Sequence, residues 1–325
     1  MIKKIIIKNN DKGKRLDKFL SEYLKNETRS QIKKMIENGL ILINGKKTKV
    51  HHFLKIEEKI SISLSAKISK NKNIKETEKD TQKLKPKIIF EDNDFLVLEK
   101  PSGMLTHSTD LGEKNTMADW LAKKYPEITN IGENKYRGGI IHRLDKDVSG
   151  VIVAAKNNQA FNNLKEQFKK RQVKKIYIAL VYGKIENSKG EINLPIGRNK
   201  NGQFVAHPKK KNEKLMQRDK FAKTAYKVLK YIKDYTLLEI QIFTGRTHQI
   251  RAHFQAIGHP IIGDPIYKPK NKFLHFLRKK IKVIDVERIF LHSQKIGFKN
   301  TKNEWVEFFS PLPDKLKKIL DGQKK

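Results

Sequence analysis

The chain has 325 residues, 37% of them hydrophobic, and its 71 lysines and arginines against 35 aspartates and glutamates give a formal net charge of +36. This length fits about two domains, and a charge of this size predicts a polyanionic partner, either nucleic acid or a membrane surface. Cysteine is absent, which excludes disulfides and fits a reducing cytoplasm. We find neither the ~20-residue apolar run of a membrane span nor a signal peptide.

Residues 1–65 are predicted to form two short helices followed by a small sheet. Apolar side chains at positions 16, 19, 20, 23 and 24 have helical spacing. Thr28, with Gln31 three residues later, is a capping box that opens the second helix, which ends at Gly39. Asn44-Gly45 predicts a hairpin turn, because both residues tolerate positive φ. The expected strands cover 1–9, 40–43, 46–50 and 60–64.

One face of this first module is predicted to be cationic. The second helix carries Arg29, Lys33 and Lys34 beside its apolar positions, and further lysines follow on the hairpin. A compact basic face suits contacts with RNA phosphates, so we expect Arg29 and Lys33 to bind RNA. The alternative is an ordinary solvated lysine face, since lysine is abundant throughout the chain.

Residues 66–86 contain few apolar side chains and many charged ones, which predicts a flexible linker. A larger domain is expected over 87–325. Its strands are predicted over 88–90, 95–98, 139–141, 151–155, 174–182, 224–232, 236–243, 290–292 and 305–309. Helices are predicted over 161–168 and 316–320. A third is expected to begin after Thr116, and residues 244–253 are expected to lead into a fourth. Strands dominate and do not alternate strictly with helices, so the fold class is α+β.

The stretch from His142 to Gly150 holds two carboxylates, two cations and a histidine between two expected apolar strands. It ends in Ser149-Gly150, which we interpret as a turn pair. Polar groups on a tight loop between buried strands are how rigid scaffolds present reactive side chains. The alternative is a charged surface turn.

A second polar stretch, Thr244 to His253, follows an alternating strand and turns at Gly245. Arg246, Thr247 and His248 would lie near a helix start, where free N–H groups favour anions, and Arg251 adds a further cation. The alternative is a polar helix start with ordinary surface charge.

We expect no metal site in these stretches. His248 and His253 are five residues apart, not the i, i+4 pair of zinc helices. Asp145 and Asp147 could suggest magnesium, but Arg143 and Lys146 already supply countercharge.

The central stretch resembles the His-Arg-Leu-Asp-x-x-Thr-Ser-Gly signature of the RluA-type pseudouridine synthases. Further motifs of that family match in the same order, over about 88–320: 98–103 with His107, 177–183, 244–253, 258–260 and 263–264. Val148 stands where the family usually has threonine, which puts any hydrogen bond made there in doubt.

The first module resembles the RNA-binding module first described in ribosomal small-subunit protein S-four. The matching motifs, over about 14–64, are Arg15-Leu16-Asp17, Arg29-Ser30-Gln31, Gly39 and Ile43-Asn44-Gly45. This pairing of domains resembles the RluD or RluC branch, which acts on large-subunit ribosomal RNA. The resemblance therefore implies a small α/β RNA-binding module, then a catalytic domain with a mixed, largely antiparallel sheet, peripheral helices and a central active-site cleft.

The resemblance also implies a chemistry, in which uracil is detached from its ribose, rotated and rejoined through carbon five without a cofactor. Asp145 would be the nucleophile, and Arg246 would pair with it and fix its orientation. Tyr177 would pack on the uracil, Arg143 would enter the helix as the uridine leaves, and Ile250 would line the pocket.

From these residues we predict catalytic roles for Asp145, Tyr177 and Arg246. The predicted substrate or RNA contacts are Arg143, His142, Ile250, His248, Arg251, Arg29 and Lys33. The basic runs 209–211 and 278–280 are further candidates. The expected protein is a cytoplasmic monomer without cofactor or membrane contact, acting on ribosomal RNA. Transfer RNA and a non-catalytic role in RNA binding or ribosome assembly are the alternatives.

Overall fold

The computed structural model describes most of the chain, as two compact units. The described residues are 2–24, 29–63, 84–108, 113–132, 137–199, 201–207, 219–269 and 286–322. Unit 1 comprises Met1–Asp80 with Ser108–Lys114, and unit 2 comprises Thr81–His107 with Asn115–Lys325. Several predictions lie outside the described residues, namely the Thr28 cap, linker residues 66–83, and the basic runs 209–211 and 278–280. Within the described helices, none is long and apolar enough to cross a membrane.

Unit 1 has the predicted helices and sheet. Its elements are β1 (Ile2–Ile6), the 3-10 turn η1 (Asn9–Asp11), α1 (Leu16–Tyr23), α2 (Arg29–Glu37), β2 (Ile41–Ile43), β3 (Lys46–Lys47) and β4 (Lys59–Ser63). The strands pair antiparallel in the order β1-β4-β2-β3, so β1 is the predicted edge strand. The returning strand β3 is shorter than expected, because it ends at Lys47 rather than Val50.

The core of unit 1 explains why these elements form. The apolar stripes of α1 and α2 bury Leu16, Leu20, Ile32 and Ile36 completely or almost completely against the sheet. The hairpin between β2 and β3 turns through Asn44 and Gly45, whose φ angles of 49° and 76° are both positive, as predicted.

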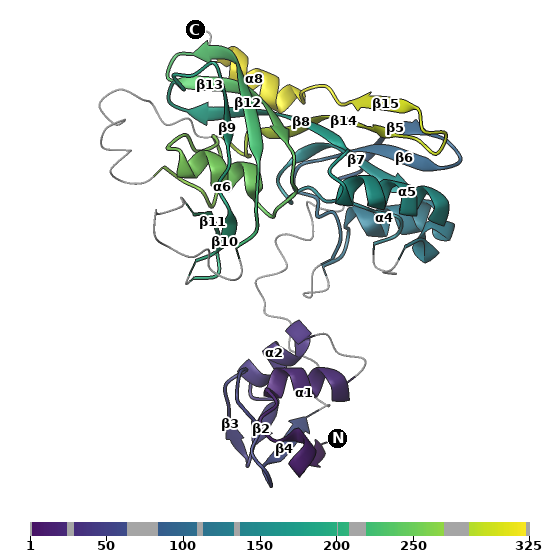
Figure 1. The fold of residues 1–325 in the computed structure, drawn as a ribbon, viewed down its shortest axis with the longest axis vertical. Coiled ribbons are helices and arrows are strands. Elements are labelled where there is room, and N and C mark those ends of the chain that lie inside the picture. The colour runs from purple at the N-terminus through teal and green to yellow at the C-terminus, as the bar shows by residue number, and fades with distance from the viewer. Residues whose placement is uncertain are drawn as a thin grey trace. The chain divides into compact units, whose positions relative to one another are not determined.

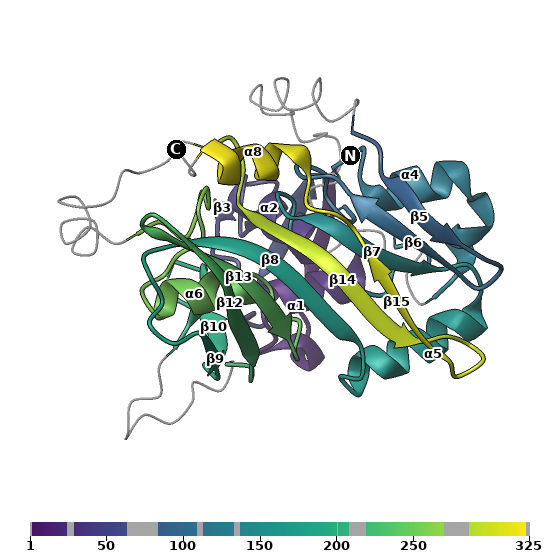
Figure 2. The same cartoon turned by 90° about the horizontal axis from the view of Figure 1, so that it is seen from above.

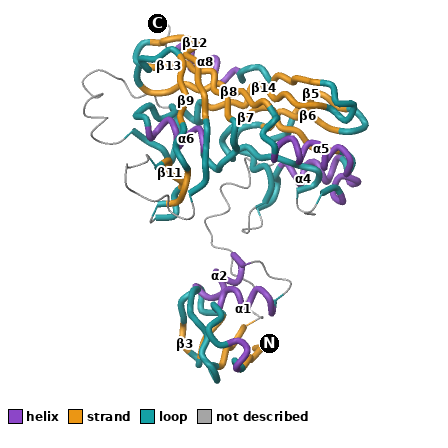
Figure 3. The backbone as a smooth tube through the Cα atoms, in the orientation of Figure 1, coloured by secondary structure: helices purple, strands orange, loops and turns teal. Residues whose placement is uncertain are grey.

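Unit 2 is built on one large mixed sheet (Figures 1 and 3). Its strands are β5 (Lys87–Glu91), β6 (Phe95–Lys100), β7 (Ser149–Ala155), β8 (Lys174–Tyr182), β9 (Lys189–Ile192), β12 (Thr224–Ile232), β13 (Tyr235–Ile242), β14 (Leu291–Lys299) and β15 (Trp305–Phe309). They pair in the order β5-β6-β7-β14-β8-β13-β12-β9, with β15 on β14. Only the pairing of β7 with β14 is parallel among the described strands, so the sheet is mixed and largely antiparallel, as expected.

Helices pack on this sheet at several separate places (Figure 2). The helical elements are α4 (Met117–Lys124), the 3-10 turn η3 (Pro126–Asn130), α5 (Asn158–Lys169), α6 (Gln249–Ala256) and α8 (Asp314–Gly322). Helices α4 and α5 pack on β6 and β7, whereas α6 packs on β8 and β13. The predicted cap of α4 is present, since Thr116 and Asp119 form a capping box. The loop before β7 packs against α6, since its Leu144 and Val148 share an apolar cluster with Ile250.

Two predictions around the central stretch are wrong. Residues 139–141 form no strand and make only a bridge from Ile140 to Ala154, because Gly138 and Gly139 both adopt positive φ. Ser149 and Gly150 are not a turn but the first residues of β7, where they pair with His292 and Ser293 of β14. The short strands β9, β10 (Ile196–Arg198) and β11 (Phe204–Ala206) were not predicted.

Candidate active site

The loop from His142 to Val148 is held in place by the segment that follows β6. The buried ammonium of Lys100 donates to the carbonyl oxygens of Pro101, Met104 and Lys146, at 2.9, 2.7 and 2.9 Å. Burial lowers the pKa of Lys100 to about 7, against the opposing charges of Asp147 and Asp145. Lys100 thus joins the loop, through the Lys146 carbonyl, to the segment that follows β6, through the carbonyls of Pro101 and Met104.

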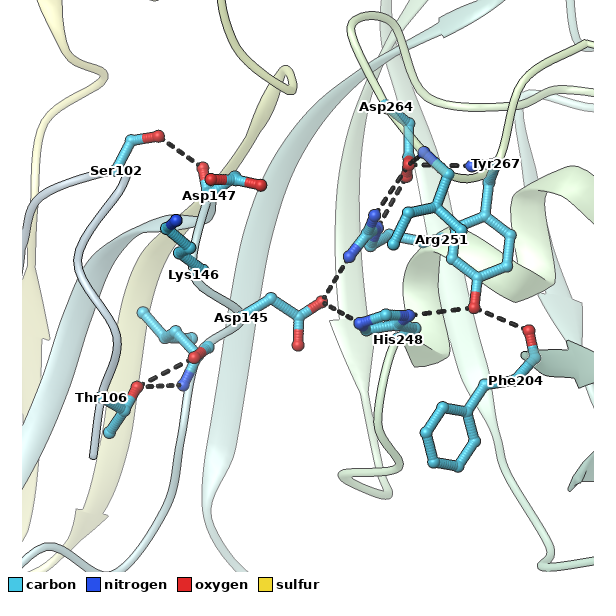
Figure 4. A network of polar contacts seen from close by, with 12 residues as sticks. Ser102, Thr106, Asp145, Lys146, Asp147, Phe204, His248, Arg251, Asp264 and Tyr267 are labelled. Carbon is cyan, nitrogen blue, oxygen red and sulfur yellow. Dashed lines mark hydrogen bonds and ion pairs between the residues drawn. The ribbon is translucent and has the colours of Figure 1, made fainter. Parts of the chain in front are cut away.

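Three further contacts fix the same loop through its main chain. Thr106 Oγ1 donates to the Leu144 carbonyl at 2.8 Å and accepts the Leu144 N–H at 3.2 Å. Ser102 Oγ donates to the Asp147 carbonyl at 2.7 Å, as Figure 4 shows. Since the main chain is fixed on both sides of Asp145, the position of its carboxylate is set before any ligand arrives.

The carboxylate of Asp145 pairs with Arg251, not with Arg246 as predicted. Arg251 Nη1 donates to Asp145 Oδ2 at 3.1 Å (Figure 4). The rest of this guanidinium is bound by Asp264, with Nε to Oδ2 at 2.6 Å and Nη2 to Oδ1 at 2.7 Å. Burial works to lower the pKa of Arg251, but the bonds and charge of Asp264, helped by Asp145, raise it above its ordinary value.

Backbone geometry explains why Arg246 does not reach Asp145. His248 has a φ of 57°, and α6 begins only at the next residue, so Arg246 precedes the turn while Arg251 lies in the first turn of the helix. Arg246 Nε instead donates to the Phe221 carbonyl at 3.0 Å. Arg246 still lines the cavity beside Asp145, so it remains near the site without pairing with the carboxylate.

His248 lies on the other side of the carboxylate, with Nε2 3.8 Å from Asp145 Oδ2. Its Nδ1 is 3.0 Å from the Tyr267 hydroxyl, which itself donates to the Phe204 carbonyl at 2.6 Å. Because that hydroxyl has one proton, Nδ1 of His248 must be the donor. Burial lowers the pKa of His248, although the charge of Asp145 opposes this effect.

A small cavity of about 90 Å³ adjoins Asp145 and brings most of the predicted site residues together. Its lining includes Arg143, Asp145, Tyr177, Arg246, His248, Ile250 and Arg251. Pockets for drug-sized ligands span ~300–1,000 Å³, so this space suits one planar ring. Burial and the charge of Asp145 raise the pKa of Tyr177 above its ordinary value, although Ser293 opposes them, so its hydroxyl is protonated at neutral pH.

His142, for which we predicted a contact with substrate or RNA, does not line this cavity but lines a neighbouring pocket. Its Nε2 accepts the Val153 N–H at 3.0 Å, and its ring stacks on Phe168 with 4.9 Å between centroids. Burial, with the nearby Lys175, lowers the pKa of His142 to about 3. The neutral imidazole of His142, which accepts this main-chain hydrogen bond, therefore anchors the start of the loop to β7.

Val148 belongs to an apolar cluster next to the cavity. Its side chain is buried in the cluster that contains Leu144, Tyr177 and Ile250. A hydroxyl there would need a partner, so valine suits this chain's packing.

The predicted RNA contacts of unit 1 are only partly described. Lys33 is exposed and lies 3.7 Å from Glu37 on the same helix face, while Arg29 opens α2. A groove lined by Lys33, Lys47, Lys49 and Phe53, among others, makes this face basic. Across the described ranges, no group of three or more His, Cys, Asp or Glu side chains is placed to hold a metal ion.

Sequence reasoning missed several residues that build the site. Lys100 and Asp264 belong to motifs that we identified, but we gave them no role. Their signal is a lysine and an aspartate in otherwise buried segments, since such charges are almost never fully buried without partners. Tyr267 had no comparable signal, because an isolated tyrosine in a loop is common.

Comparison with known proteins now identifies the family. The model of the RNA pseudouridylate synthase family matches residues 94–256, and the S4 domain model matches residues 14–60. The chain is 32% identical to the uncharacterized RNA pseudouridine synthase YlyB of Bacillus subtilis, over 97% of this chain and 95% of that one. The chain belongs to the RNA pseudouridylate synthase family. It is therefore an enzyme that isomerises uridine in RNA.

Two further similarities agree with this family. The chain is 31% identical to ribosomal large subunit pseudouridine synthase C of Vibrio parahaemolyticus, over 96% of this chain and 94% of that protein. The solved structure of human RNA pseudouridylate synthase domain containing 1 superposes with a TM-score of 0.54 and 27% identity, covering 70% of this chain and 84% of that one. This chain therefore combines an N-terminal RNA-binding S4 domain with an α+β synthase domain.

Proposed function

We propose that this enzyme converts a specific uridine of large-subunit ribosomal RNA into pseudouridine, with Asp145 as the nucleophile. The observation that carries this proposal is the Asp145 carboxylate, 3.1 Å from Arg251 and beside a cavity of about 90 Å³. A carboxylate that is fixed in position can attack an electrophilic carbon and form a covalent intermediate.

The reaction would begin with extrusion of the uridine from its helix, since a base stacked in a helix cannot reach the Asp145 carboxylate beside its small cavity. Asp145 then attacks the anomeric carbon or the uracil ring, and the bond from the anomeric carbon to N1 breaks. The uracil rotates, a new bond forms from the anomeric carbon to C5, and the bond to Asp145 breaks, which regenerates the free carboxylate. The C5 proton leaves as N1 takes one up. Arg251 keeps the carboxylate oriented throughout.

Tyr177 and Arg143 would handle the base. The Tyr177 ring forms one wall of the cavity, and its protonated hydroxyl can pack beside uracil without introducing charge. Arg143 is exposed at the mouth of the same cavity, so its side chain can fill the space that the flipped uridine leaves. Ile250 supplies an apolar wall.

Two observations favour ribosomal RNA as the substrate. The N-terminal module presents a basic groove. One relative that aligns with nearly the whole chain is named a ribosomal large subunit pseudouridine synthase. We further propose that Arg29 and Lys33 contact RNA phosphates and that the protein is a cytoplasmic monomer. Transfer RNA remains the alternative substrate, and mapping pseudouridines in cells that lack this protein distinguishes the two.

Replacing the Asp145 nucleophile is the direct test of this proposal. We expect Asp145→Asn and Asp145→Ala to abolish pseudouridine formation in unmodified large-subunit ribosomal RNA while RNA binding is largely kept, because the basic surfaces are intact. The matched control is Asp147→Asn, two residues away, which accepts the hydrogen bond of Ser102 through its main-chain carbonyl. Full activity of either Asp145 variant would remove this residue from the mechanism.

A non-catalytic role in ribosome assembly is the second candidate, and the basic module alone would serve it. An intact Asp145–Arg251–Asp264 arrangement favours the enzyme, because a scaffold that only binds RNA has no need of it. If cells that lack the whole protein assemble large subunits normally and miss only the modification, the assembly role is excluded.

A further inference from the structure

A second pocket, with a volume of about 440 Å³, is strongly cationic. It adjoins the cavity of about 90 Å³ beside Asp145, called the base cavity below. Its charged lining consists of Arg137, Arg143, Lys169, Arg171, Lys175 and Arg246. No aspartate or glutamate lines it within the part of the chain that the structure describes. It shares Arg143, Tyr177 and Arg246 with the base cavity, so whatever it holds lies next to the reacting nucleotide.

Lys175 is the innermost cation of this pocket, with only 8% of its surface exposed. Its ammonium has no hydrogen bond or ion pair among the described residues, and lies 5.5 Å from the centre of the Phe168 ring. Burial lowers the pKa of Lys175 to about 8, so most of it stays charged at neutral pH. A buried cation without a counterion costs stability, and such costs are retained mainly where function needs them.

His107 and Arg246 in this pocket also face positive charge. His107 Nδ1 is buried and has no hydrogen-bond partner among the residues that the structure describes. Burial, with repulsion from Arg143 and Arg137, lowers the pKa of His107 to about 4, and burial with repulsion from Arg171 lowers that of Arg246. An anion among these groups would relieve each repulsion and accept a bond from Lys175.

We propose that this pocket binds a backbone phosphate of the substrate RNA next to the flipped uridine, with Lys175 and His107 as its innermost donors. This inference rests on the proposed function for the placement of the uridine. Flipping rotates a nucleotide about its backbone, which carries the adjacent phosphate toward the protein together with the base. A fixed cation waiting there offsets part of the cost of unstacking.

A neighbouring base fits this pocket less well than a phosphate does. Two phenylalanine rings line the pocket. Phe168 is already covered by His142, with 4.9 Å between ring centroids, and by the Lys175 ammonium, and the Lys223 ammonium lies 5.1 Å from the centre of the Phe243 ring. The six cationic side chains of the lining supply the charge and hydrogen-bond donors that phosphate oxygens require.

Lys175→Met tests the proposal because it has opposite expected effects on stability and on RNA binding. Methionine keeps the length and removes the desolvated charge, so the melting temperature should stay equal or rise. RNA affinity should fall about ten- to a hundred-fold, and the slope of log affinity against log salt should become smaller by about one. The probe is the unmodified large-subunit ribosomal RNA transcript with the full-length protein.

The control is Lys302→Gln, an exposed lysine in the β14–β15 turn that lines neither pocket. It should leave both the affinity and the salt slope close to wild type. If Lys175→Met unfolds the protein, Arg171→Gln at the exposed rim supplies the same comparison. Unchanged affinity and slope in the folded variants overturn the proposal.

Titration with inorganic phosphate separates RNA phosphate from a free anion. The NMR signals of the His107 ring should shift on addition of RNA, and free phosphate should compete only weakly. Tight binding of free phosphate that RNA does not displace refutes the RNA site. Loss of affinity in Lys175→Met, together with full activity of Asp145→Asn, would keep this site and reject the proposed nucleophile.

Discussion

At the scale of single residues, the site depends on how one guanidinium is divided between two carboxylates. Asp264 takes two of the Arg251 nitrogens, and its Oδ1 also accepts the N–H groups of Ile266 and Tyr267. The Asp264 side chain is completely buried. Arg251 is therefore rigid, and its remaining nitrogen can point only at Asp145.

Replacing Arg251 by lysine should separate its role from that of Arg246. Lysine cannot form the forked pair with Asp264 and still reach Asp145, so we expect Arg251→Lys to lower single-turnover pseudouridine formation at saturating protein by at least ~10²-fold. Arg246→Lys should lower the rate much less and weaken RNA binding instead. A larger rate loss in Arg246→Lys than in Arg251→Lys would contradict this assignment.

The sequence predicted which residues gather at the site but not how they pair. Asp145, Tyr177, Arg246 and Ile250 do line one cavity. The partner of Asp145 could not be chosen, because Arg246 and Arg251 stand in one motif and only the left-handed turn at His248 decides which faces the carboxylate. No pattern in the sequence predicts that the backbone of His248 adopts a left-handed conformation.

At the scale of elements, the two halves of the large sheet are joined where β7 meets β14. Ser149 Oγ is 2.9 Å from His292 Nδ1, and His292 Nε2 is 3.0 Å from the Ser310 carbonyl. Burial lowers the pKa of His292 to about 4. Arg288 donates to the same Ser149 oxygen at 2.7 Å. This buried chain of bonds lies directly behind the loop that carries Asp145.

Gly150 lets the two strands come close, and alanine should disrupt the joint. Its φ is 120°, and an added Cβ would lie 2.1 Å from the Ser293 carbonyl oxygen. We expect Gly150→Ala to lower the free energy of unfolding by about 2–4 kcal/mol, measured by urea denaturation. Gly245→Ala, whose Cβ would meet nothing within 4 Å, is the control. Equal stability of both variants would show that the strands can separate without cost.

Periodicity predicted the long elements well and the short ones poorly. Strand β8 has Tyr177 and Ala179 on one face and Ile178 and Leu180 on the other, as expected from its alternation. Strands β10 and β11 have three residues each, too few to show a period. The expected strand at 139–141 does not form because Gly139 and the preceding Gly138 both adopt positive φ, which apolar composition does not indicate.

At the scale of the whole molecule, the chain combines two cores with a large excess of positive charge. Unit 1 buries its own apolar cluster, and unit 2 buries several others. Since each unit has a separate core, loss of one need not unfold the other. The formal charge of +36 makes binding to RNA strongly dependent on salt.

Deleting residues 1–64 should weaken RNA binding more than it damages the active site. Linked modules raise each other's effective concentration, so we expect the affinity for ribosomal RNA to fall by ~10²-fold. The single-turnover rate at saturating protein should remain close to wild type, because none of the site residues of unit 2 is removed. Equal RNA affinity with and without these residues would refute the anchoring role.

The attachment of the Asp145 loop has one consequence for its tolerance of sequence change. Lys100, Ser102 and Thr106 grip carbonyl and amide groups rather than side chains, and every amino acid except proline carries both groups. The loop can therefore exchange residues around its aspartate, as with valine at position 148, without losing its shape. Sequence change in the loop from His142 to Val148 would therefore be limited more by the contacts from Lys100, Ser102 and Thr106 than by the side chains of the loop itself.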